Sequence, residues 1–164
     1  MNNIVEAIIE IPVGSKNKYE IDKKSGRIKI DRVNYSSMTY PAEYGYIENT
    51  LALDGDPLDI LVLTTEASFP GCIMDARIVG YLDAIDSGFN DQKIIAVINV
   101  DPRFNHINNI YDIPEHTKLE IKNFFETYKD LQNIKVIVND FHDKEEALLV
   151  LEECKNRYQL KKGI

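Results

Sequence analysis

The chain has 164 residues, 44% of them hydrophobic, which is long and apolar enough for a domain with a substantial core. Its formal net charge of −8 argues against a nucleic-acid partner, because binding a phosphate backbone requires an excess of basic side chains. No apolar run approaches the roughly 20 residues that cross a bilayer, so we expect no membrane partner either.

The N-terminal segment predicts where the protein resides. Glu6 and Glu10 interrupt its only apolar stretch, and no basic region precedes that stretch, which argues against a signal peptide. We therefore expect a cytoplasmic protein. Because the sequence has no internal repeat and no low-complexity tract, we also expect residues 1–164 to form a single domain.

The first hundred residues are predicted to form short strands. Segments rich in β-branched residues alternate with Gly, Pro, Asn and Asp, which is typical of strands joined by turns. The predicted strands cover residues 4–11, 18–21, 27–30, 46–53, 59–63, 73–82 and 93–100. Their number and spacing favour a small antiparallel barrel or sandwich.

Two helices are predicted after the strands. Pro114 suits the first turn of a helix, and apolar residues from Ile121 to Tyr128 recur at the spacing of one helix face. That face belongs either to the core or to a subunit interface. A second helix begins near Asp143, with Glu146 three residues on, as in a capping box. Strands followed by helices indicate an α+β chain.

An acidic segment, LALDGDPLDILVL, is the first candidate site. Asp54, Asp56 and Asp59 lie between apolar runs that must enter the core, so their carboxylates are expected at the rim of the barrel. A solvated turn explains DGDP equally well, because Asp, Gly and Pro are common turn residues.

A second acidic loop contains Asp86 and Asp91, shortly before Lys93. If the two loops converge, five carboxylates share one pocket, and each pair about 5 Å apart repels by roughly 3 kcal/mol at an effective dielectric of about 20. Such a cluster requires cations, and oxygen ligands suit Mg²⁺ or Mn²⁺. These metals activate water against phosphoryl groups, so we expect a metal-dependent hydrolase of a small phosphate compound.

Several motifs follow one another along the chain in a recognisable order. They are EIP at Glu10, KYE from Lys18, IDR ending at Arg32, YPAEYGYI from Tyr40, DGDPLDI from Asp54, D-x4-D-x-K from Asp86 to Lys93, and FFETYKDL around Tyr128 and Lys129. Together they resemble the family I soluble inorganic pyrophosphatases of bacterial type, whose signature is D-x-D-P-hydrophobic-D-hydrophobic. The resemblance implies an OB-like antiparallel β-barrel with a five-stranded core and two C-terminal helices packed on it. It also implies hydrolysis of pyrophosphate to two orthophosphates.

The resemblance assigns roles to the acidic residues. Asp56 would be the general base for a metal-activated water. Four aspartates would ligate Mg²⁺, with Mn²⁺ or Zn²⁺ as substitutes: Asp54, Asp59, Asp86 and Asp91. Glu10 and Glu20 would serve a further metal or its waters. Family members of bacterial type are commonly hexamers, so the resemblance also implies a homohexamer.

The resemblance places cationic and hydroxyl donors on the phosphates of the substrate. These residues are Lys18, Arg32, Tyr44, Lys93, Tyr128 and Lys129. Arg32 can make a bidentate contact with a phosphate that a lysine cannot make.

Two other functions compete with this interpretation. LALDGDP also resembles the strand and D-x-D motif of haloacid-dehalogenase-type phosphatases, but that fold alternates strands with helices, unlike the order predicted here. A small barrel that binds metal or oligonucleotides without catalysis is the second alternative. Such barrels bind nucleic acid through basic grooves, whereas the predicted rim is acidic.

Overall fold

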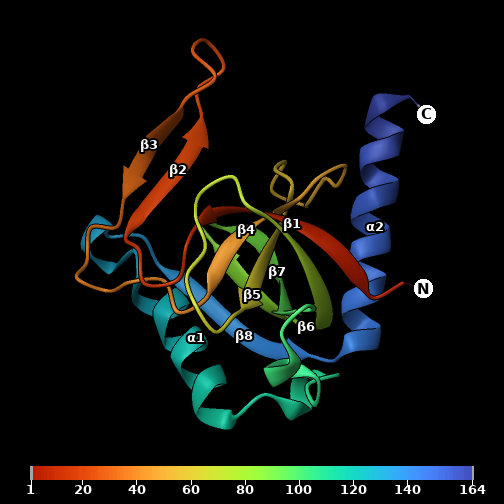
Figure 1. The fold of residues 1–164 in the computed structure, drawn as a ribbon. Helices are drawn as coiled ribbons and strands as arrows, with labels where there is room; N and C mark the ends of the chain where they lie inside the picture. Colours follow the sequence, from red (N-terminus) through yellow and green to blue (C-terminus); the bar gives the residue numbers. More distant parts are fainter. Residues whose placement is uncertain (1, 164) are drawn as a thin grey trace.

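The computed structural model describes residues 2–163, and Figure 1 shows how their strands and helices are arranged. The strands are β1 (Ile4–Ile11), β2 (Asn17–Ile21), β3 (Ile28–Val33), β4 (Glu43–Ile47), β5 (Leu58–Leu63), β6 (Ile73–Asp86), β7 (Phe89–Ile98) and β8 (Val136–His142). The helices are α1 (Glu115–Thr127) and α2 (Lys144–Lys162), and short 3-10 turns lie at Pro102–Phe104, Ile110–Asp112 and Asp130–Gln132.

Five strands close into a barrel. They pair in the order β1, β4, β5, β7 and β6, and β6 returns to pair with β1 through Ile73–Arg77. The pairs are antiparallel except for β5 and β7, which run parallel with Asp59 opposite Lys93. The predicted α+β fold with a five-stranded, OB-like core is confirmed, and the parallel pair is the exception within its otherwise antiparallel arrangement.

The strand predicted over 46–53 is wrong in its bounds. β4 covers Glu43–Ile47, and the chain then turns away from the sheet. The Thr50 hydroxyl donates to the Ile47 carbonyl and accepts from the Leu58 amide. Hydrogen bonds to this side chain therefore replace backbone hydrogen bonds between β4 and β5 at this point. Asn49 has a positive φ of 59°, which also ends an extended segment.

The sequence-based prediction missed β8, which lies between the two helices. β8 pairs with the second half of β6, outside the barrel ring. Val136 and Val138 are buried and Ile137 is exposed, which is the alternation of a strand with one covered face. The prediction that all strands precede the helices is therefore wrong at this segment.

Both helices pack against the barrel through apolar faces. α1 buries Ile121, Phe124 and Phe125 in one core cluster, so its predicted apolar stripe belongs to the core. α2 buries its own stripe in a second cluster with residues of the barrel strands. The Asp143 side chain accepts from the Glu146 amide at 2.9 Å, which is the N-cap half of the predicted capping box. The Glu146 carboxylate contacts His142 at 2.9 Å instead of completing the box. No helix within residues 2–163 is long and apolar enough to span a membrane.

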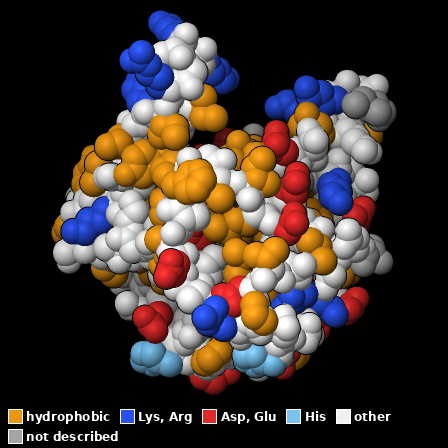
Figure 2. Space-filling model, in the orientation of Figure 1, with side chains coloured by type: hydrophobic (Ala, Val, Ile, Leu, Met, Phe, Trp, Pro, Cys, Tyr) orange, Lys and Arg blue, Asp and Glu red, His pale blue; other side chains and the backbone are white. Residues whose placement is uncertain are grey.

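The hairpin of β2 and β3 projects away from the barrel (Figure 1). Its tip gathers basic side chains, visible at the upper left of Figure 2. These are Lys23, Lys24, Arg27 and Lys29. The opposite end of the hairpin brings Lys18 and Arg32, which are paired across the two strands, to the edge of the barrel.

Candidate active site

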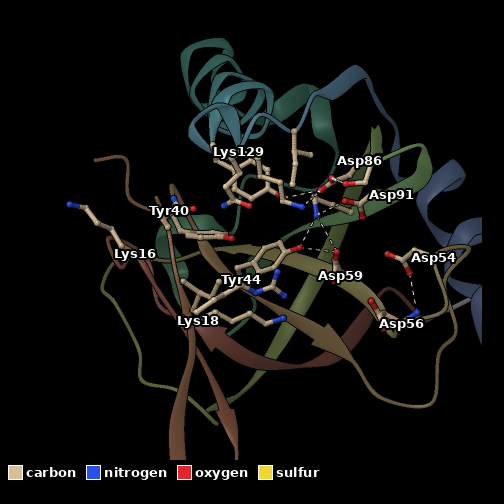
Figure 3. A pocket seen from close by; sticks show the side chains of 18 of the residues that line it. Lys16, Lys18, Tyr40, Tyr44, Asp54, Asp56, Asp59, Asp86, Asp91 and Lys129 are labelled. Atoms are coloured by element: carbon tan, nitrogen blue, oxygen red, sulfur yellow. Dashed lines mark hydrogen bonds and ion pairs between the residues drawn. The ribbon is translucent and has the colours of Figure 1, made fainter. Parts of the chain in front are cut away.

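A pocket of about 440 Å³ opens where the hairpin, the barrel rim and the end of α1 meet. The loop between β4 and β5 and the turn between β6 and β7 both reach it, so the condition for the two acidic segments to share one pocket is met. Figure 3 shows the labelled aspartates along one side and the labelled lysines and tyrosines across from them. The lining includes Lys16, Lys18, Arg32, Asn34, Tyr40, Tyr44, Asp54, Asp56, Asp59, Asp86, Ser87, Asp91, Lys93, Tyr128, Lys129 and Gln132.

Lys93 is the most deeply buried charged residue in the lining of this pocket. Its side chain is 2% exposed, and its ammonium lies 3.0 Å from Asp91 and 3.1 Å from Asp59. It also donates to the hydroxyl of Tyr44 at 2.7 Å, and that hydroxyl donates to Asp59 at 2.8 Å. The rings of Tyr44 and Phe125 lie 4.9 and 4.8 Å from the ammonium, which adds a cation–π contribution.

The charges in this cluster depend on one another. Burial alone lowers the pKa of Lys93, but Tyr44 and the carboxylates of Asp59 and Asp91 raise it well above its usual value, so the lysine stays protonated. Burial is the largest cause of the rise in the pKa of Asp91 to about 6. Attraction to Lys93 opposes the rise, and repulsion from Asp59 and Asp54 adds to it. An added cation would therefore stabilise the charged form of Asp91.

Asp86 belongs to a second ion pair at the end of α1. Its carboxylate accepts from Lys129 at 2.8 Å and from the Tyr128 hydroxyl at 3.1 Å. Burial opposes ionisation, but these donors outweigh it, and the pKa of Asp86 is lowered. The Ser87 hydroxyl adds a contact to the same carboxylate at 3.0 Å, at the tight turn from β6 to β7. Tyr128 also packs in the core, so it both packs and lines the pocket.

Asp54 and Asp56 lie on the exposed loop before β5. The turn DGDP closes through the Asp56 amide, which donates to the Asp54 carboxylate at 3.0 Å. Gly55 has a φ of 91°, a conformation that only glycine adopts readily. Burial and the charges of Asp59 and Asp56 raise the pKa of Asp54, although the backbone contact opposes the rise. The Asp54 carboxylate is thus close enough to those of Asp59 and Asp56 for their charges to raise its pKa.

Aromatic side chains pack against one another beside the pocket. Tyr40 lies 5.2 Å from Tyr44 and 4.6 Å from Phe124, measured between ring centroids. Burial raises the pKa of Tyr40 to about 12, so it keeps its proton at neutral pH. Phe124 stacks on Tyr128 at 5.2 Å, which connects α1 to the pocket. This packing holds the hydroxyls of Tyr44 and Tyr128 in place.

The structure brings together all but two of the predicted site residues. Glu10 and Glu20 lie outside the lining of the pocket. Glu10 is on β1, close enough for Lys18 and Asp59 to influence its pKa, which burial raises. Glu20 is exposed on β2. The resemblance placed both residues at a metal, and the structure has Glu10 on a barrel strand and Glu20 on the hairpin.

Several lining residues were not predicted. Tyr40 begins the YPAEYGYI motif, and this position was a usable signal. Lys16 lies two residues before Lys18, and in an extended chain side chains two positions apart lie on the same face. Asn34 and Gln132 come from a strand end and a short turn that carry no pattern in the sequence.

The donor chemistry of the pocket fits hard divalent cations, because five carboxylates share one wall. Among residues 2–163, no three His, Cys, Asp or Glu side chains are already gathered closely enough to enclose a metal. Three of the carboxylates are instead paired with Lys93 and Lys129. The fit is therefore one of donor type and charge, and the lysines neutralise part of the carboxylate charge.

Comparison with known proteins identifies the family. The family described as inorganic pyrophosphatase matches residues 7–159. An inorganic pyrophosphatase of Geobacillus stearothermophilus is 55% identical over 161 residues, covering 98% of each chain. The structure of an inorganic pyrophosphatase from Thermus thermophilus superposes with a TM-score of 0.90 at 45% identity, over 96% of this chain and 92% of that one. One from Helicobacter pylori also gives 0.90, at 44% identity, over 96% and 94%. This chain belongs to the inorganic pyrophosphatase family.

Proposed function

We propose that the chain hydrolyses inorganic pyrophosphate to two orthophosphates with the help of Mg²⁺. One observation supports this most directly: five carboxylates and a group of lysines, tyrosines and an arginine line the same pocket. A substrate that is small and highly charged requires metal ions on one side and cationic donors on the other.

The metal would lie on the acidic side of the pocket. The family works with divalent metal ions, and Asp54, Asp59, Asp86 and Asp91 are the residues we propose as ligands, with Glu10 and Glu20 serving a further ion or its waters. When bound, a divalent cation lowers the pKa of water and neutralises charge on the phosphoryl groups. Lys93 and Lys129, which pair with three of these carboxylates, would then be free to donate to phosphate.

Asp56 is the proposed general base. Its side chain is exposed to the pocket, and among residues 2–163 no basic side chain forms a salt bridge with it, so it is free to accept a proton. It takes a proton from the attacking water as the oxygen bonds to one phosphorus. The bond from that phosphorus to the bridging oxygen breaks, and the bridging oxygen leaves with the second phosphate.

The remaining predicted residues would hold the two phosphates. Lys18 and Arg32 face the pocket from the hairpin, and Arg32 is exposed enough to turn its guanidinium toward a phosphate. Tyr44, Lys93, Tyr128 and Lys129 contribute donors from the barrel and α1. Donors on separate elements orient the substrate so that one phosphorus faces Asp56.

A phosphate-release assay tests this function. Pyrophosphate with Mg²⁺ should give rapid release, which stops in EDTA and returns when Mg²⁺ is added in excess. p-Nitrophenyl phosphate is the control substrate and should give little release. Equal turnover of the two compounds would favour a general phosphatase instead.

We also propose a cytoplasmic homohexamer in which residues 1–164 act as one domain. The unbroken family match over residues 7–159 supports the single domain. Light scattering should give about six times the chain mass of 18.8 kDa. A mass equal to that of one chain would contradict the hexamer.

A further inference from the structure

The loop over residues 48–57 carries two of the proposed functional carboxylates yet contains little regular structure. At its base, the hydroxyl of Thr50, a residue that is 3% exposed, bridges Ile47 and Leu58. At its tip, the Ala52 amide donates to the Asp56 carbonyl at 2.7 Å. These contacts give the loop its shape, but they do not by themselves fix the loop against the rest of the molecule.

Helix α2 supplies that external attachment. The Leu51 amide donates to the Cys154 carbonyl at 3.0 Å, and the Leu51 carbonyl accepts from the Arg157 guanidinium at 2.6 Å. Both backbone groups of one loop residue are thus bonded to one helix. Ala52 and Cys154 share a buried cluster, which places apolar contact beside these bonds.

Arg157 makes few other contacts that would explain its position. Its Nη1 also lies 3.7 Å from the Cys154 sulfur, and within residues 2–163 it forms no salt bridge with a carboxylate. A guanidinium bonded to a backbone carbonyl makes a charge-assisted contact, which is stronger than one between neutral groups. The bond lies three residues before Asp54 and five before Asp56 in the chain.

We propose that Arg157 is a positioning residue: by bonding the Leu51 carbonyl, it fixes the loop that carries Asp54 and Asp56 against α2, and so aligns these carboxylates with those on β5 and β7. It touches neither substrate nor reacting atoms. The inference rests on the proposed function for its catalytic consequence, but the attachment of the loop is testable without activity.

Amide hydrogen exchange on the EDTA-treated protein tests the attachment. Arg157→Met keeps the aliphatic stem and loses the donor. A peptide covering residues 48–57 should then exchange about 10-fold faster than in the wild type, because a hydrogen bond to a charged group is lost. The matched control is Lys155→Met, which removes the same charge from α2 but whose ammonium pairs with Glu152 at 3.8 Å. It should leave exchange in this peptide unchanged.

Kinetics then test the consequence. Arg157→Met should lower kcat for pyrophosphate about 10-fold with a smaller change in KM, because the phosphate donors lie on other elements. Arg157→Lys retains a donor and should restore most of kcat and of the protection. Thermal unfolding checks that each variant is folded, and Arg157→Leu, which also lacks a donor, serves if Arg157→Met is not folded.

The outcomes separate the two proposals. Unchanged exchange at residues 48–57 in Arg157→Met would overturn the positioning role, and so would an equal increase throughout the barrel. A kcat of Arg157→Met equal to that of Lys155→Met would overturn its catalytic consequence. A wild-type protein that releases no phosphate from pyrophosphate would instead overturn the proposed function, and the exchange result would still stand.

Discussion

The ammonium of Lys93 lies 3.0 Å from the carboxylate of Asp91, and both side chains are almost fully removed from solvent. The two residues are separated by one position on β7, so the period of a strand places their side chains on the same face. Asp59, directly opposite Lys93 on the parallel neighbour β5, completes the cluster. Lys93 and the two carboxylates favour one another's charged forms, whereas the carboxylates repel each other, and this balance leads to the first two predictions.

Removing the central cation should destabilise the barrel. Lys93→Met leaves Asp59 and Asp91 without their partner, and an uncompensated buried charge costs about 3–5 kcal/mol. Urea unfolding at pH 7.5 without metal measures the loss. Adding Asp91→Asn to this variant should recover part of it, because one of the orphaned charges is then removed. A double variant no more stable than Lys93→Met would show that the unpaired charge of Asp91 is not the cause of the loss.

Cation binding should weaken as the pH falls through about 6. Burial raises the pKa of Asp91 to about 6, so below that value the proton occupies a group proposed to hold the metal, and above it the carboxylate is available. Calorimetric titration with Mg²⁺ should show an affinity that is steady near pH 8 and falls by up to about tenfold per pH unit below 6. An affinity that is constant from pH 5 to pH 8 would contradict the role of Asp91.

Asp56→Asn should lower kcat by about 10² to 10⁴, the usual contribution of a general base. Because Asp56 is exposed on its loop, the unfolding free energy of the variant should differ little from that of the wild type. Steady-state rates between pH 6 and pH 9 give the first quantity, and urea unfolding gives the second. Asp130→Asn, an exposed aspartate outside the pocket lining, is the matched control. Turnover near that of the wild type across this range would remove Asp56 from the role.

Tyr128→Phe should weaken substrate binding and stability together. The variant keeps the ring in the aromatic cluster but removes the hydroxyl that donates to Asp86 at 3.1 Å. We expect a loss of about 1 kcal/mol in the unfolding free energy and a severalfold increase in KM for pyrophosphate. Tyr111→Phe, at an exposed tyrosine outside the pocket lining, should change neither. An unchanged KM would indicate that Tyr128 serves packing alone.

Gly45→Ala should prevent the barrel from closing normally. A Cβ at this position on β4 would lie 1.8 Å from the Ile8 carbonyl oxygen on β1, so the backbone pairing would have to shift. Gly14→Ala is the control, since its Cβ would meet nothing within 4 Å and its cost is limited to a φ of 84°. That strain is worth roughly 1–2 kcal/mol. Circular dichroism and thermal unfolding of the two variants should differ sharply, and equal stabilities would contradict the close approach of β1 and β4.

Features set by short-range spacing could be predicted from the sequence. The period of a strand places Asp91 and Lys93 on one face, and the helix period groups the apolar residues of α1. The Asp143 cap follows from local hydrogen-bonding chemistry. The motifs also predicted the family, because each motif is a short run of neighbouring residues and their order along the chain can be read directly.

Other features depend on contacts between distant segments, and no local pattern contains them. Thr50 ends β4 by bonding across to Leu58, and β8 is a strand because the second half of β6 is available to pair with it. Glu20, on β2, was expected at a metal but lies outside the pocket lining, because the position of the hairpin relative to the barrel is a tertiary property.

The sequence by itself determined which residues carry charge, which faces they occupy on their own elements, and which family they belong to. Only the tertiary structure decided that Lys93 is buried between Asp59 and Asp91, and that α2 holds the loop of Asp54 and Asp56 through Arg157. The physical reason is that burial and electrostatic coupling depend on distances across the closed barrel. Those distances are set by chain closure and packing, which neighbouring residues in the sequence do not encode.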